Sequence, residues 1–222
     1  MLKLMENYIH SFDNEKFIKN YFINKNDELQ GLTGAATSQI ISKCVSLMDR
    51  SNVYLEVGIY QATNLVLVAS ENKNKLCFGV DNFSQEFIED ANYPSMTTEE
   101  VVNKRIKEFN VEKNCLIFKM DFRKFLNSSN ILLKNKVEVY FFDGPHTLQD
   151  QLDGVEMAFP FLADEALIFV DDWASENVVE ASKILLEKHK QNLKIVKILN
   201  SQYNVRKFFN QGQIVFKYTR NI

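Results

Sequence analysis

Residues 137–146 read Val137-Glu-Val-Tyr-Phe-Phe-Asp-Gly-Pro-His146. The first six are mostly β-branched or aromatic, which predicts a strand buried in a parallel sheet. The strand stops at Asp143 because a glycine and a proline turn the chain, and Thr147 with Asp150 is typical of the N-cap of a following helix. A carboxylate and an imidazole therefore follow the carboxyl end of a central strand, where open α/β sheets bind their ligands.

The composition describes an ordinary globular protein. The chain has 222 residues, of which 45% are hydrophobic, and a formal net charge of -3, so it can bury a full core. Scattered lysines and arginines argue against a nucleic-acid partner. No apolar run approaches the roughly 20 residues of a membrane span, and we expect neither a signal peptide nor a membrane partner. Three cysteines without metal-ligand spacing indicate reduced core residues in a cytoplasmic protein.

Residues 1–50 are predicted to form a helical extension of the main domain, residues 51–222. Apolar side chains recur at helical spacing between Ile9 and Phe22 and again between Ile40 and Met48. We expect this extension to pack on the sheet. It is either a layer that completes the core or a cover over the ligand.

From residue 53 onward, short apolar runs alternate with helical patterns. The predicted strands are Val53–Val57, Leu76–Val80, Cys115–Met120, Val137–Phe142 and Ala166–Val170, and the predicted helices are Asn64–Glu71, Val101–Phe109, Phe125–Leu133, the one that follows Thr147, and Glu176–Lys190. This alternation predicts an α/β protein with a parallel sheet and helices on both faces. No helical pattern separates the last two strands, Lys194–Leu199 and Gln213–Tyr218, so they should pair antiparallel at an edge.

Each of the first five strands ends in polar or acidic residues. Gly58 permits a tight turn beside a ligand after the first strand. Asp81 ends the second strand, where a carboxylate can accept two hydrogen bonds from a ribose diol. The remaining strands end in Asp121-Phe122, Asp143 to His146, and Asp171-Asp172. Five such ends in order indicate a ligand site more strongly than any single one.

Together these stretches resemble the class I S-adenosylmethionine-dependent methyltransferases, in particular the small-molecule O-methyltransferases with a strand-end Asp-Gly-x-His motif and a later Asp-Asp pair. The resemblance covers roughly Val53 to Trp173. It implies a Rossmann-like fold with a seven-stranded mixed sheet of order 3-2-1-4-5-7-6. It also implies S-adenosylmethionine as the cofactor, lying over the first strands.

The same resemblance implies roles for the strand-end residues. Glu56 and Gly58 would belong to the nucleotide-binding loop, and Asp81 would hold the ribose hydroxyls. Because Glu56 belongs to a buried strand, it can instead be a structural residue that pairs with a backbone amide or a lysine. Asp121 with Phe122 would border the adenine. Asp143 would face the methionine end of the cofactor or a metal.

The chain departs from the family pattern at two places. Ala62 stands where the family loop usually has a second glycine, and its methyl group would lie near the cofactor. Because of this substitution, weak or absent cofactor binding stays an alternative. The second departure, Glu165-Ala166 in place of two glycines, lies away from the expected site.

His146 and Asp143 are the predicted catalytic residues. As a neutral imidazole near its usual pKa, His146 can take the proton of a substrate hydroxyl; it can instead cap the next helix or bind Asp143. Asp143, Asp171 and Asp172 are a candidate Mg²⁺ site because this hard cation prefers carboxylate oxygens. Asp172 or Ser175 can instead cap the helix that follows.

The sequence therefore predicts O-methylation of a hydroxyl on a small molecule such as a sugar or polyol, with metal assistance left open. Two alternatives remain. One is a methyltransferase-like scaffold without activity, which Ala62 favours and Asp81, Asp143 and His146 oppose. The other is a nicotinamide-dependent oxidoreductase, which normally needs Gly-x-Gly-x-x-Gly where this chain has only Gly58. The oligomeric state also stays open, a homo-oligomer included.

Overall fold

The protein is built around a single seven-stranded sheet. The structure is a computed structural model, and it describes residues 1–12, 34–84, 95–128, 132, 134–199 and 211–221. The strands are β1 (Val53–Val57), β2 (Leu76–Asp81), β3 (Cys115–Lys119), β4 (Val137–Phe142), β5 (Leu162–Val170), β6 (Leu193–Leu199) and β7 (Gln213–Thr219). Their order is β3-β2-β1-β4-β5-β7-β6, which confirms the α/β fold and the strand order that the resemblance implied.

Strand direction changes only at one side of the sheet. β1 pairs in parallel with β2 and β4, and β4 pairs in parallel with β5. β7 lies between β5 and β6 and pairs antiparallel with both, as predicted. All five residues of β1 and all six of β4 are buried, because helices cover both faces of these central strands.

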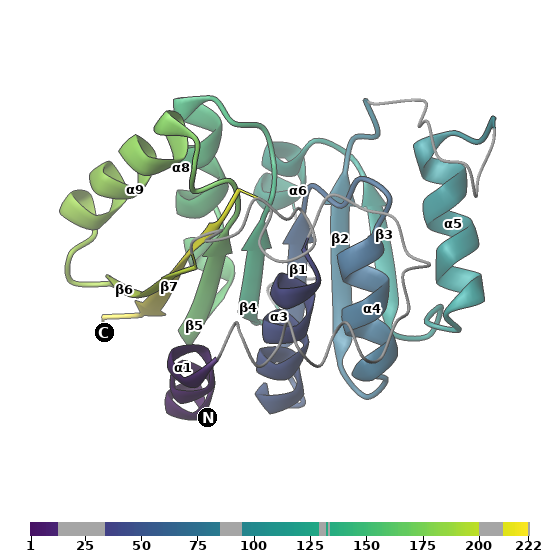
Figure 1. Ribbon diagram of the computed structural model, residues 1–222, viewed down its shortest axis with the longest axis horizontal. Coiled ribbons are helices and arrows are strands. Elements are labelled where there is room, and N and C mark those ends of the chain that lie inside the picture. The colour runs from purple at the N-terminus through teal and green to yellow at the C-terminus, as the bar shows by residue number, and fades with distance from the viewer. Residues whose placement is uncertain (13–33, 85–94, 129–131, 133, 200–210, 222) are drawn as a thin grey trace.

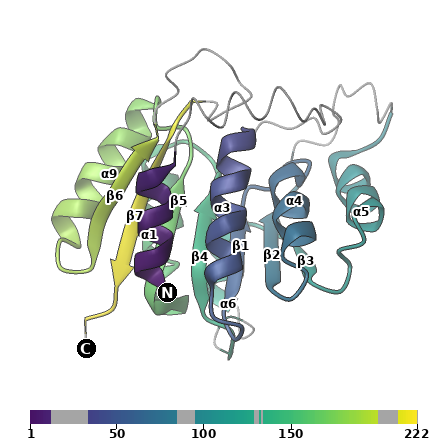
Figure 2. The ribbon, with the colours of Figure 1, turned by 60° about the horizontal axis from the view of Figure 1, so that its bottom comes forward.

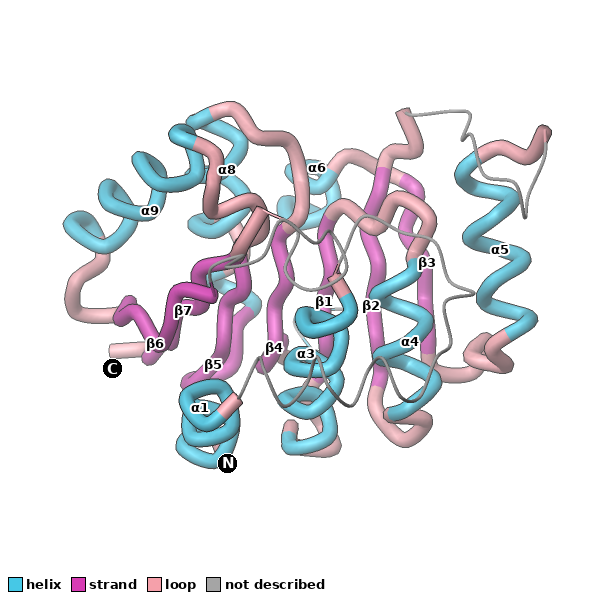
Figure 3. Tube along the Cα trace, viewed as in Figure 1, coloured by secondary structure: helices cyan, strands magenta, loops and turns pink. Residues whose placement is uncertain are grey.

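The helices form two layers, one on each face of the sheet (Figures 1 and 2). One core cluster joins the sheet to α1 (Leu2–Ser11), α3 (Ala35–Leu47), α4 (Thr63–Glu71) and α5 (Thr98–Glu108). The other joins it to α6 (Phe122–Ser128), α8 (Leu148–Glu156) and α9 (Glu176–Lys188). Figure 3 shows the loops that connect the strands to these helices. Ligand-binding loops therefore have a rigid support on both sides.

Local capping explains where the helices begin. The Thr97 side chain accepts from the backbone of Glu100, and Glu100 reaches back to Thr97, which makes the predicted capping box of α5. Thr147 caps α8, also as predicted. α6 begins at Phe122, earlier than expected, because the Asp121 carboxylate accepts from the backbone N–H groups that follow it.

The described part of the N-terminal extension packs on the sheet. Leu2, Met5 and Ile9 of α1 and Ile40 and Ile41 of α3 are buried in the same core cluster as the strands. No residue of α1 or α3 lines the pocket described below. Residues 13–33 lie outside the described residues, and the predicted cover over the ligand stays a prediction there. Within the described segments, no helix is both long and apolar enough to cross a membrane.

Candidate active site

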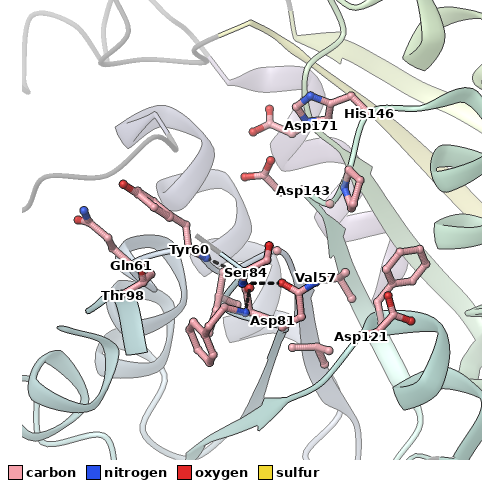
Figure 4. Close-up of a pocket in the computed structure, with 18 of the residues that line it drawn as sticks. Val57, Tyr60, Gln61, Asp81, Ser84, Thr98, Asp121, Asp143, His146 and Asp171 are labelled. Atoms are coloured by element: carbon pink, nitrogen blue, oxygen red, sulfur yellow. Dashed lines mark hydrogen bonds between the residues drawn. The ribbon is translucent and has the colours of Figure 1, made fainter. Parts of the chain in front are cut away.

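A pocket of about 470 Å³ lies at the carboxyl ends of the parallel strands (Figure 4). Its volume is within the roughly 300–1,000 Å³ that small-molecule sites occupy. Of the residues predicted for the site, it brings together Gly58, Asp81, Asp121, Phe122, Asp143, His146, Asp171 and Asp172. Residues that are more than 100 positions apart in the chain therefore meet at one edge of the sheet.

The turn between β1 and α4 passes very close to the end of β4. Gly58 has φ +82°, and a Cβ atom there would lie 1.8 Å from the backbone carbonyl oxygen of Asp143. Only glycine fits this approach and this left-handed conformation. The predicted tight turn at Gly58 is therefore required by the contact between two strand ends.

Ala62 also lies in this turn but points away from the pocket. Its φ is +55°, its side chain is fully buried in the core under α4, and it is not among the pocket-lining residues, although Gln61 and Thr63 are. The extra methyl group therefore adds no atom to the pocket wall. The structure therefore shows no contact of Ala62 with the pocket, and weak cofactor binding stays an open alternative.

Asp81 connects the end of β2 to the same turn. Its Oδ2 accepts a hydrogen bond from the backbone N–H of Tyr60 at 2.9 Å, and its Oδ1 accepts one from Phe83 at 2.8 Å. Each carboxylate oxygen has two lone pairs. The carboxylate is thus held in one orientation and can still accept hydrogen bonds from a ligand diol.

Asp121 and Phe122 form the wall of the pocket beyond β3. Asp121 Oδ1 accepts from the backbone N–H groups of Arg123 and Lys124, at 3.0 and 3.3 Å. The Phe122 ring packs edge-on against Phe142, with ring centroids 5.4 Å apart, and the Arg123 guanidinium lies 4.5 Å from its centroid. These contacts fix a flat aromatic side chain beside an acid.

Glu56 lies in the interior and does not line the pocket, unlike its predicted place in the nucleotide-binding loop. Its Oε2 accepts from the Tyr54 hydroxyl at 2.6 Å and from the Asn64 amide at 2.7 Å. Burial raises the pKa of Glu56 to about 8 despite these hydrogen bonds. Glu56 therefore holds Asn64, in the first turn of α4, through this hydrogen bond.

The ends of β4 and β5 bring three aspartates and a histidine together. His146 Nε2 lies 2.6 Å from Asp172 Oδ2, and this hydrogen bond raises the pKa of His146 above its usual value, so the expected ordinary pKa is wrong. Asp171 Oδ1 accepts from the Gln213 amide at 3.1 Å. Asp143 hydrogen-bonds Asp171.

The crowding of these acids changes their protonation. Burial, together with the charges of Asp171 and Asp172, raises the pKa of Asp143 well above its usual range. Burial and the charge of Asp172 raise the pKa of Asp171 to about 7. The proximity of the acids therefore favours the protonated forms of Asp143 and Asp171 over the two free carboxylates.

A possible metal-binding group differs by one member from the predicted set. The ligand atoms of Asp143, His146 and Asp172 lie within 4.8 Å of one another, while Asp171 is bound to Gln213 instead. Carboxylate and imidazole groups suit a divalent cation. The side chain of Asp172 pairs with His146, and Ser175 stands at the N-cap of α9, so the alternative role of Asp172 as a helix cap is not observed.

The sequence did not single out Arg105, which holds the turn after β1 from α5. Arg105 is fully buried, and its Nη1 donates to the Gln61 carbonyl oxygen at 2.9 Å and to Thr63 Oγ1 at 2.6 Å. The sequence does contain an indication of this role. Arg105 follows Val101 by four residues and therefore lies on the apolar face of a predicted helix. A charged residue at such a position needs a buried partner.

Comparisons with known proteins agree with the fold. A family model described as a methyltransferase domain matches residues 55–173, just over half of the chain. No curated protein matches the chain.

Solved structures share the fold at low sequence identity. Cofactor-bound Rv0187 from MTB is 12% identical with a TM-score of 0.67, over 94% of this chain and 96% of that one. The O-methyltransferase TomG from Streptomyces achromogenes, solved in complex with SAM, is 13% identical with a TM-score of 0.66, over 95% and 100%. An O-methyltransferase from Bacillus cereus, solved with SAH, is 11% identical with a TM-score of 0.65, over 92% and 96%.

Proposed function

This chain belongs to the family of methyltransferase domains, and on that premise we propose that it uses S-adenosylmethionine to methylate a hydroxyl of a small molecule such as a sugar or polyol. One observation carries the proposal: the oriented carboxylate of Asp81 and the His146–Asp172 pair line the same pocket. The first suits a nucleoside and the second suits a hydroxyl that must lose a proton. Two solved structures with this fold, one in complex with SAM and one in complex with SAH, support the choice of cofactor.

The residues present fit this cofactor. Asp81 would accept hydrogen bonds from the ribose hydroxyls, and Asp121 with Phe122 would border the adenine. The glycine at position 58 keeps the wall free of a side chain where the ends of β1 and β4 approach each other. S-adenosylmethionine, when bound, supplies a methyl group activated on a positively charged sulfur. Much of the rate of such a transfer comes from holding the acceptor oxygen in line with that methyl group.

His146 is proposed as the proton acceptor. Because Nε2 is held by Asp172, Nδ1 is the nitrogen that would take the proton of the acceptor hydroxyl. Asp172 orients the ring and stabilises the imidazolium that forms. Asn177 donates to the backbone carbonyl oxygen of His146 at 2.9 Å and holds the loop in place.

We also propose that the acidic cluster binds a divalent cation, with Asp143 and Asp172 as ligands. The described residues that line the pocket include no lysine or arginine to balance these acids. A bound cation would supply the charge that lowers the pKa of an acceptor hydroxyl. It would also compete with His146 for Asp172. Because His146 is the proposed proton acceptor, adding or removing the cation should change turnover.

The test is a calorimetric titration of the purified protein with S-adenosylmethionine and S-adenosylhomocysteine, each with and without Mg²⁺, with NAD as a control. We expect saturable binding of both sulfur nucleotides and none of NAD, followed by methylation of hydroxylated acceptors. A folded protein that binds neither nucleotide would instead be a scaffold. Turnover that is unchanged by Mg²⁺ and by chelator would remove the cation from the proposal.

A further inference from the structure

Arg123 connects the pocket wall at Phe122 with the helix that follows His146. Its guanidinium lies 4.5 Å from the centroid of the Phe122 ring. On α8, its Nη2 binds Asp150 Oδ1 at 2.5 Å and its Nε binds Asp153 Oδ2 at 2.6 Å. The side chain of Arg123 is 32% exposed and that of Asp150 is 15% exposed, so this pair is better shielded from water than an ordinary surface ion pair.

Asp150 extends this contact to the loop that carries His146. Its second carboxylate oxygen, Oδ2, accepts a hydrogen bond from the Thr147 hydroxyl, and its backbone N–H donates to Thr147 Oγ1 at 3.1 Å. Thr147 is the next residue after His146 in the chain. Arg123 is therefore linked to the backbone of the proposed proton acceptor through the side chains of Asp150 and Thr147.

Asp153 binds the same arginine without this link to the loop. It lies about one helical turn beyond Asp150 on α8. Besides Arg123, it accepts a hydrogen bond from the Gln149 amide at 2.6 Å. Both of these partners lie outside residues 145–147, so the two acids differ in what they can transmit to His146.

The three charged residues of this cluster do not line the pocket, so they would act by positioning other groups. In Figure 4, Asp121 and His146 lie on one side of the pocket, and Tyr60 and Gln61 lie on the other. The wall assigned to the adenine and the proposed proton acceptor are therefore on the same side, the side that Arg123 supports. A misplacement of about 1 Å at a reacting group can slow a reaction by roughly 100-fold, so support at this side matters for turnover.

We propose that Arg123 is a positioning residue that couples the binding of a nucleoside at Phe122 to the placement of His146, through its ion pair with Asp150. This inference rests on the proposed function, which assigns the adenine to Phe122 and the proton transfer to His146. A nucleoside that packs on Phe122 restrains the adjacent Arg123, and the ion pair passes this restraint to the first turn of α8. The proton acceptor is therefore ordered when the cofactor is bound.

The test measures backbone hydrogen exchange of residues 146–150 with and without saturating adenosine. Adenosine contains the adenine and ribose but lacks the sulfur, methyl and amino-acid groups of the cofactor, so we expect it to make no direct contact with His146. Coupling between two sites commonly amounts to roughly fivefold or more, and we expect adenosine to slow exchange in the parent by that factor. In Arg123→Met, whose unbranched side chain can still cover Phe122, most of this slowing should disappear.

Asp150→Asn and Asp153→Asn form the matched pair of variants. Each removes one carboxylate charge from Arg123 and keeps the size of the side chain, and Asp150→Asn also keeps the backbone N–H that binds Thr147. Asp150→Asn should lose the effect of adenosine, whereas Asp153→Asn should keep it. The double variant of Arg123→Met and Asp150→Asn should behave as Arg123→Met alone, because both changes break the same contact. The contact of Phe122 with Phe142 is common to all of these proteins.

Calorimetric titration with adenosine shows that each variant is folded and saturated, so a change in exchange is not a loss of binding. Three results would overturn the inference. One is a parent that binds adenosine with unchanged exchange at residues 146–150, and another is an Arg123→Met variant that keeps the full slowing. The third is an equal loss in Asp150→Asn and Asp153→Asn, which would show that Arg123 only joins α6 to α8. A folded parent that binds no adenosine would instead remove the proposed function.

Discussion

Both ends of the central strands bury polar side chains, and the two ends differ in how these groups are satisfied. At the amino end, the Asn114 amide donates to the carbonyl oxygens of Ala69, Asn72 and Lys75 at 3.0 to 3.3 Å. At the carboxyl end, the pKa of Asp143 is raised by burial and by the neighbouring acids Asp171 and Asp172, and Gln61 Oε1 has no partner among the described residues. Polar groups at the amino end of the strands are therefore paired within the protein, whereas some at the carboxyl end have no protein partner among the described residues.

This difference separates stability from function. A buried polar group left unpaired costs about 1–3 kcal/mol of stability, and violations of this kind gather at functional sites. We therefore expect substitutions at the amino end to change stability without changing binding, and substitutions at the carboxyl end to do the reverse.

His146→Ala should give the largest effect. Loss of a positioned proton acceptor lowers turnover by roughly 10²–10⁴-fold, so kcat should fall by that factor, while calorimetry should show nearly parental affinity for S-adenosylhomocysteine. His10→Ala, on the exposed side of α1, is the control and should turn over normally. Unchanged kcat in the His146 variant would exclude this residue from the mechanism.

Asp81→Ala tests the ribose assignment. Because a carboxylate that holds a diol makes two charge-assisted hydrogen bonds, the affinity for S-adenosylmethionine should fall by about 100-fold. Asp49, an acid at the opposite end of the sheet, binds the backbone N–H and the hydroxyl of Ser51. Asp49→Ala should therefore leave the affinity unchanged. If Asp81→Ala bound the cofactor as the parent does, the assignment would be wrong.

Asn114→Ala tests the amino end. The variant removes a donor from three carbonyl oxygens, of which those of Ala69 and Asn72 keep a backbone N–H donor, so the free energy of unfolding in urea should fall by about 1–3 kcal/mol. Cofactor affinity of the folded variant should be unchanged, because Asn114 does not line the pocket. A large loss of affinity would show that the two ends are coupled and that the comparison does not hold.

Glu56→Gln tests the effect of a buried acid on stability. Glu56 lies in the interior next to the pocket but does not line it. Burial raises the pKa of Glu56 from 4.5 to about 8 in the folded protein. The folded state therefore binds an extra proton, and the stability that it provides is complete below pH 4.5 and is lost as the pH rises through about 8. The loss reaches at most about 1.4 kcal/mol per pH unit.

The Gln variant should show a smaller fall in stability between pH 5 and pH 8, measured by urea denaturation across this range. The substitution is sterically conservative, and Asn64 Oδ1, which has no partner among the described residues, can accept from the new amide. Parallel pH profiles of the two proteins would mean that Glu56 is ionised in the fold at neutral pH.

The strands and helices of the sheet could be predicted from the sequence. Their periodicities, and the acids that follow each strand, are local patterns that depend only on residues close together in the chain. The sequence was not sufficient for the orientation of Glu56. β1 is buried on both faces, so the alternation of polar and apolar residues that would assign a side chain to one face is missing. Likewise, the sequence does not show that Ala62 adopts a positive φ and points into the core.

Contacts between segments that are far apart in the chain could not be predicted from the sequence either. Arg105 and Gln61 are 44 positions apart, and the significance of each depends on the other. Within the acidic cluster, three aspartates look equivalent in the sequence. The fold separates them, because Asp172 pairs with His146 while Asp171 pairs with Gln213 from a strand near the end of the described chain.

The position of β7 has a consequence for synthesis on the ribosome. β6 pairs only with β7 among the described strands, and β7 separates it from β5. A nascent chain that has not yet reached residue 213 therefore has an unpaired edge on β5, an unpartnered β6, and an Asp171 without its amide donor. Such edges are prone to pair with other chains, so we expect the nascent chain to be most prone to aggregation before β7 is added.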